Sequence, residues 1–133
     1  MKMTIEELLQ TPYRIIDILP RQVPKDSSGQ YFAIEEYFLR KTRITAIKQK
    51  HVNVVLKLNC YRDVALDDEM TINPSPNRIA KTMKARYVCI RVDDAMTVSE
   101  PDSTFMTLYN PNQSLLELVT FLAQSEGLFV WKP

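Results

Sequence analysis

Val52-Asn53-Val54-Val55-Leu56-Lys57-Leu58-Asn59-Cys60-Tyr61 is the stretch of the sequence with the clearest alternation of side-chain character. Five apolar side chains would share one face of an extended chain: Val52, Val54, Leu56, Leu58 and Cys60. A period of two residues, with β-branched valines among the apolar positions, is typical of a strand that packs on one side. We therefore predict a strand over Val52–Tyr61 and give it a central place in the fold.

Other segments with strand character lie on both sides of this stretch. Arg86–Val92 alternates in the same way, with Val88, Ile90 and Val92 on one face and Tyr87, Cys89 and Arg91 on the other. Four more strands are predicted from β-branched and aromatic content. They cover Tyr13–Leu19, Ala95–Val98, Thr104–Tyr109 and Leu128–Trp131.

Three helices are predicted from their end signals. Thr4 and Glu7 form a capping box, which predicts a short helix over Thr4–Gln10. Ser75 followed by Pro76 predicts a helix start, with Asn77–Lys84 as the helix. In the run 110–113, Asn110 is the predicted cap of a third helix, which Gly127 ends.

A long or composite helix is predicted after the proline-rich loop that follows the first strand. Ser27 or Ser28 is its predicted cap, and the helix begins near Gln30. The β-branched cluster Thr42–Thr45 leaves open a break or a short strand within it. Asp63–Pro76 is an acidic, proline-containing connection that we expect to be mobile.

The order of these elements predicts one α+β domain over residues 1–133. Helices should cover one face of a mainly antiparallel sheet, giving a two-layer sandwich. The repeated strand–helix–strand order is compatible with a ferredoxin-like sandwich (split βαβ) with extra elements.

Composition is that of an ordinary globular protein, with 45% hydrophobic and 25% charged residues. The N-terminal segment is not an export signal, and no run of roughly 18 apolar residues is present, so we predict a cytoplasmic protein without a membrane partner. Cys60 and Cys89 are then expected to be reduced thiols in the core.

Charge is divided into blocks, although the net charge is only +1. Residues 37–62 hold seven Lys and Arg and no acid, and residues 70–92 hold five and no acid. Residues 63–69 hold four acids and residues 93–131 hold six, with no Lys or Arg in either block. Either the acidic blocks fold back over the basic ones, or the basic blocks form a face for an acidic partner.

The second alternative defines a candidate binding surface of Lys57, Tyr61, Tyr87 and Arg91. If the two best strands lie in one sheet, these side chains share its open face and could bind single-stranded nucleic acid by stacking and charge neutralisation. No RNP-like run supports this hypothesis, and acidic blocks adjoin the basic ones. Nucleic acid is therefore the less favoured partner.

Catalytic, metal-binding and cofactor-binding residues are not predicted anywhere in the chain. His51 is the only histidine, and a histidine that ends a helix is usually a favourable terminal residue. Asp93–Asp94 and Asp67–Glu69 have the composition of turns and lack the spacing of a calcium loop. An enzyme assembled without a local motif stays open as a further alternative.

The favoured hypothesis is a non-enzymatic binding or interaction module that associates with itself. Tyrosines and Trp131 are residues that interfaces favour, and Leu128–Trp131 would be an apolar sheet edge. A homodimer is the expected state.

Overall fold

An antiparallel sheet of six strands is the centre of the computed structural model, which describes residues 2–25 and 29–133. The strands lie in the order β2-β3-β4-β5-β1-β6. Their bounds are β1 Tyr13–Asp17, β2 Ala65–Leu66, β3 Val88–Val92, β4 Ala95–Ser99, β5 Met106–Tyr109 and β6 Phe129–Trp131. The predicted fold class is confirmed, because helices pack on this antiparallel sheet.

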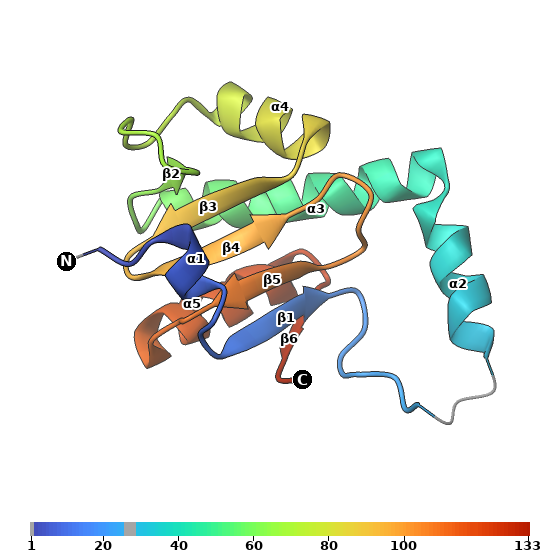
Figure 1. The fold of residues 1–133 in the computed structure, drawn as a ribbon. Helices are drawn as coiled ribbons and strands as arrows, with labels where there is room; N and C mark the ends of the chain where they lie inside the picture. The colour runs from blue at the N-terminus through green and yellow to red at the C-terminus, as the bar shows by residue number, and fades with distance from the viewer. Residues whose placement is uncertain (1, 26–28) are drawn as a thin grey trace.

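The helices lie mainly on one face of the sheet (Figure 1). Their bounds are α1 Ile5–Leu8, α2 Gln30–Leu39, α3 Lys41–Asn59, α4 Pro76–Ala85 and α5 Gln113–Ser125. Val88 and Ile90 of β3 join α3, α4 and α5 in the main core, whereas Cys89 between them contacts Leu8 of α1. The short α1 therefore covers part of the opposite face, in front of the sheet in Figure 1.

One split βαβ unit is present in the sheet. Strands β5 and β6 both pair antiparallel with β1, which lies between them, and α5 connects them. The chain that leaves β1 through α2 and α3 instead returns to the far edge of the sheet at β2. The β3–β4–β5 meander fills the space between, so the ferredoxin-like arrangement is present only around β1.

The predicted strand over Val52–Tyr61 is wrong, because this stretch is the C-terminal half of α3. The spacing of its apolar residues fits both the two-residue period of a strand and the 3.6-residue period of a helix, and the chain folds as a helix. Ile47, Val54, Val55 and Leu58 are all buried and fall at helical spacing. Packing between the sheet, α4 and α5 outweighs the strand preference of valine, since tertiary contacts supply most helix stability.

Helix ends follow the predicted signals in two cases out of three. Thr4 makes both hydrogen bonds of the capping box, and Ser75 caps α4 with Pro76 at its first turn. The cap of α5 is Asn112, whose side chain accepts from the backbone N–H of Leu115, and not Asn110. Asn110 has a positive φ of 59° and donates its amide to Asp94 instead.

The composite helix divides at Arg40, whose extended ψ of 144° ends α2 and starts α3. The β-branched cluster Thr42–Thr45 is helical, so the open alternative of a strand is excluded there. Gly29 occupies the cap position of α2 in a left-handed conformation. The predicted caps Ser27 and Ser28 lie outside the described residues.

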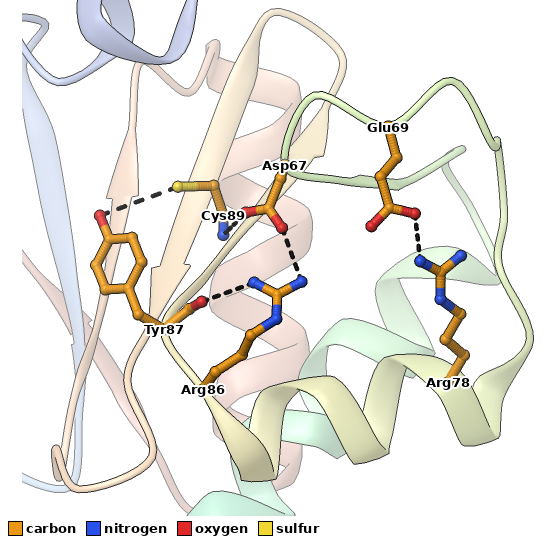
Figure 2. Close-up of polar contacts among 6 residues, drawn as sticks. All are labelled: Asp67, Glu69, Arg78, Arg86, Tyr87 and Cys89. Atoms are coloured by element: carbon orange, nitrogen blue, oxygen red, sulfur yellow. Dashed lines mark hydrogen bonds and ion pairs between the residues drawn. The ribbon is translucent and has the colours of Figure 1, made fainter.

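The connection Asp63–Pro76 is anchored to the sheet and to α4 at several points, while the mobility that its composition predicts stays a prediction. It contains β2, and the Asp67 carboxylate accepts from the Cys89 N–H at 3.1 Å and from Arg86 at 3.0 Å (Figure 2). Glu69 pairs with Arg78 of α4 in the same view. Asn73 adds a second anchor, because its Oδ1 accepts from Val64 at 2.9 Å.

Three alanine substitutions distinguish the helix from the predicted strand. In α3, Val55 and Leu58 are buried and Leu56 is half-buried, whereas a strand would place Leu56 and Leu58 on one face and Val55 on the other. Leu58→Ala should lower the free energy of unfolding by about 2–5 kcal/mol, and Val55→Ala should also destabilise clearly. Leu56→Ala should be the mildest of the three in chemical denaturation. Equal losses at Leu56 and Leu58, with none at Val55, would support the strand.

Candidate functional site

A cavity of about 330 Å³ opens on the face of the sheet that α3, α4 and α5 leave uncovered. Its floor comes from β1 and β6, where antiparallel pairing places Trp131 opposite Ile15. Alternation along β1 then puts Asp17 on the same face as Ile15. The walls come from the segment after β1, from the start of α2 and from the residue before β5: Leu19, Arg21, Gln22, Val23, Pro24, Lys25, Tyr31, Phe32 and Phe105.

Asp17 is the buried charge of this cavity, with a relative exposure of 8%. Its Oδ1 accepts from the backbone N–H of Ile18 at 2.7 Å. Burial raises the pKa of the Asp17 carboxyl, and the backbone N–H groups that it accepts from oppose the rise. No Lys or Arg among residues 2–25 and 29–133 forms an ion pair with it. A buried carboxylate of this kind usually has a cationic partner.

Trp131 adds to the cavity a buried hydrogen-bond donor that has no acceptor among the described residues. Its indole N–H is buried and has no hydrogen-bond acceptor in the described part of the chain. The indole lies close enough to the Asp17 carboxylate to favour the charged form, but without hydrogen-bond geometry. Leaving a buried donor unpaired costs about 1–3 kcal/mol.

Tyr31 and Glu35 of α2 add negative charge beside the cavity. The Tyr31 hydroxyl donates to Oε2 of Glu35 at 3.0 Å. Burial, followed by this hydrogen bond, raises the pKa of Tyr31 to about 12. The negative charge of the Glu35 carboxylate also raises the pKa of Asp17, although Glu35 itself does not line the cavity. Arg21 and Lys25 lie at the solvent-exposed rim.

This arrangement has the properties of a binding site for a small organic molecule. Ligand cavities are mostly apolar and aromatic, with a few polar groups that fix orientation. Here four aromatic rings surround one carboxylate and one N–H donor: Tyr31, Phe32, Phe105 and Trp131. The sequence did not single out Asp17. An acid at the end of the apolar strand Tyr13–Asp17 was the available signal.

A second buried polar cluster joins α3 to β4. Lys48 Nζ lies 2.9 Å from His51 Nδ1 and donates to Ser99 Oγ at 2.8 Å, and all three residues are buried. Burial lowers the pKa of Lys48 to about 8, which Glu100 and Asp102 partly oppose. Burial and the Lys48 cation lower the pKa of His51 to about 3, so the imidazole is neutral. His51 is thus inside the core and not at the predicted helix end.

The four residues of the predicted binding surface do not share one face. Lys57 lies on α3, where it pairs with Glu126 at 2.5 Å, because the predicted strand is helical. Tyr61 and Arg91 line a polar hollow of about 540 Å³ near Asp93, while Tyr87 lies just before β3. Arg91 is also buried and pairs with Asp68. The structure therefore brings only Tyr61 and Arg91 together.

The acidic blocks fold back over the basic ones, as the first interpretation of the charge pattern predicts. Each ion pair of the described chain joins a residue of a basic block to a residue of an acidic block: Lys57–Glu126, Arg62–Asp93, Arg78–Glu69, Arg86–Asp67 and Arg91–Asp68. Such pairs are worth little individually when exposed, but they reduce the field that a polyanion would meet.

The two cysteines have different environments. Cys89 is buried, as predicted, and burial raises the pKa of its thiol. Cys60 is exposed at the end of α3, so the prediction of two core thiols is wrong for this residue. The error follows from the strand assignment, which placed Cys60 on the apolar face.

Replacing Asp17 by Asn should stabilise the protein at neutral pH. A carboxyl whose pKa is raised on folding makes the folded state less stable as pH rises above the ordinary value of 3.8. Asp17→Asn removes this penalty while its side-chain oxygen can still accept from Ile18. Thermal melts should show a higher midpoint for the variant at pH 7 and a smaller gain toward pH 4. A lower midpoint at pH 7 would show that the carboxylate stabilises the fold.

Because of Lys48, the free energy of unfolding should increase as the pH is raised above about 8. Its pKa is about 8 in the folded protein and 10.5 in a free side chain, so the unfolded chain binds more protons between these values. The free energy of unfolding should therefore rise from about pH 8 to 9.5, below the range where tyrosines titrate. Lys48→Met should lose this slope, while Lys41→Met, at an exposed position of α3, should keep it. The same slope in both variants would contradict the assignment to Lys48.

Neither a metal-binding group of side chains nor a helix that could span a membrane is present in the described part of the chain. Among the described residues, no group of three His, Cys, Asp or Glu side chains is placed to hold a metal ion. No helix in the same part of the chain is both long and apolar enough to cross a membrane. Comparisons with protein-family models, with curated proteins and with solved structures find no match to this chain.

Proposed function

We propose that the protein is a binding module whose cavity between β1, β6 and α2 takes a small organic ligand. The observation that carries the proposal is a pair of buried polar groups at the cavity floor. The Asp17 carboxylate has no cationic partner in the described chain, and the Trp131 N–H has no hydrogen-bond acceptor there. Each makes the unliganded fold less stable than a fully satisfied one. A ligand that supplies a positive charge for the carboxylate and an acceptor for the N–H gains binding free energy from both interactions.

The shape of the cavity supports a compact ligand with an apolar body. Its volume of about 330 Å³ lies at the small end of the range for ligand cavities. Aromatic rings line it from three separate elements, so several contacts form at once around a ligand. Binding is favoured over catalysis because the described lining residues include no histidine, cysteine or serine, and the two basic ones, Arg21 and Lys25, are exposed at the rim.

Trp131 makes the proposal directly testable, because it is the only tryptophan in the chain and lines the cavity. A ligand in the cavity should change its fluorescence and raise the melting temperature. Phe105→Ala should weaken such a ligand about tenfold, since one aromatic side chain supplies about 1.5–3 kcal/mol of burial.

The matched control is Phe121→Ala, which removes an exposed phenylalanine of α5 outside the cavity. Its affinity for the same ligand should equal that of the wild type. A ligand that binds both variants with equal affinity sits elsewhere, and a fluorescence response that is equal in both excludes the cavity as its site.

A second candidate function is self-association through α2. None of the ten residues of α2 is buried, although the helix is strongly apolar. Phe32, Ile34, Tyr37 and Leu39 are all exposed, and α2 stands at the side of the molecule in Figure 1. Exposed apolar patches of this kind often mark interfaces. The edge strand β6 offers a second apolar surface.

Sedimentation equilibrium tests this second candidate. The wild type should give about twice the chain mass of 15.5 kDa at micromolar concentration. Ile34→Glu should shift the protein to monomer, because a dimer would bury the new charge. Phe121→Glu, on α5, should leave the dimer intact. A monomeric wild type at about 100 µM would contradict self-association.

A further inference from the structure

We infer that the ligand of the cavity carries a positively charged amine or ammonium group, which binds the Asp17 carboxylate between the aromatic rings. This inference rests on the proposed function and names its ligand class. It depends on three features: a buried carboxylate without a cationic partner, a second acid beside it, and aromatic faces around both.

The first feature is the position of Asp17. Asp17 as a residue is more than nine-tenths buried, it lines the cavity, and its carboxylate is not ion-paired to any described Lys or Arg. Water solvates it poorly, and the backbone N–H of Ile18 is its clearest hydrogen-bond donor. A ligand ammonium at this position would supply the missing opposite charge in a site of low dielectric, where the pairing is strongest.

The second feature is the balance of charge around the cavity. Glu35 of α2 acts on the same space as Asp17, and the Tyr31 hydroxyl holds its carboxylate in place at 3.0 Å. Arg21 and Lys25 are the opposing charges, but both are exposed at the rim and screened by water. Asp17 is thus the one buried charge among the described lining residues, and this negative charge favours a cation in the interior of the cavity.

The third feature is the aromatic lining. The faces of Trp131, Tyr31, Phe32 and Phe105 carry negative potential, and cations bind over such faces with about 0.5–2 kcal/mol each. The Trp131 N–H has no hydrogen-bond acceptor in the described chain, and its indole lies beside the Asp17 carboxylate.

Three probes of the same shape and different charge test the inference: 2-phenylethylamine, 2-phenylethanol and phenylacetate. Each is titrated against the wild type at neutral pH, with Trp131 fluorescence and thermal shift as readouts. We expect the amine to bind at least about tenfold more tightly than the alcohol, and the acetate to bind most weakly.

Asp17→Asn should remove this preference. Its affinity for the amine should fall at least about tenfold, while its affinity for the alcohol should stay within about twofold. Asp94→Asn, which neutralises an exposed acid outside the cavity, should behave as the wild type. In the wild type, amine affinity should also fall as acid protonates Asp17, with no change for the alcohol, so the inference is testable even if Asp17→Asn does not fold.

The outcomes separate the two proposals. If the alcohol or the acetate binds as tightly as the amine, the cavity is a ligand site but the cationic class is wrong. If Asp17→Asn keeps the amine preference, Asp17 is not the counter-ion and the inference fails. If none of the three probes changes Trp131 fluorescence or the melting temperature, the proposed function fails and the inference fails with it.

Discussion

The packing of α3 across the sheet is the interaction on which the rest of the structure depends. Val52, Val55 and Leu58 lie in one core with Ile90 and Leu108, so the helix joins strands from both halves of the sheet. Helices α4 and α5 then flank α3, and their own apolar faces complete the layer. Residues of β1, β2, β3, β4 and β5 share this core with the helix. The sheet therefore has one dry face, and its other face is free to form a cavity.

That second face is divided between α1 and the cavity. At one end Leu8 of α1 packs on Cys89 and Met96, so a single turn of helix buries apolar side chains of β3 and β4 on this face. At the other end the uncovered face of β1 and β6 lines the cavity together with the segment 19–25 and the start of α2. The cavity lies at this end because Ile15, Asp17 and Trp131 point to the uncovered side.

The helix starts were predicted correctly where residues close in sequence form the cap. The capping box at Thr4 and the Ser75–Pro76 start are fixed by hydrogen bonds within a few residues, so the sequence shows them directly. The strand Val88–Val92 was also predicted from its alternation, although all five of its residues are buried because α1 covers part of the second face. Val52–Tyr61 was mispredicted since its apolar residues satisfy periods of 2 and 3.6 together, and only the surrounding helices decide between them. The cavity could not be predicted, because its walls come from residues as distant as Asp17 and Trp131.

Three charged residues of the described chain are buried, Asp17, Lys48 and Arg91, and their partners differ. Arg91 pairs with Asp68 and donates to the backbone carbonyl of Met3. Lys48 is buried between His51 and Ser99, and both side chains lie within hydrogen-bond distance of its ammonium. That charge is thus accommodated within the fold, where it links α3 to β4. Asp17 has a backbone N–H and a misdirected indole, but no cation in the described chain. Of the three buried charges, Asp17 is the one that lines a cavity and has no opposite charge beside it in the described chain, so its negative charge is open to a cation from another molecule.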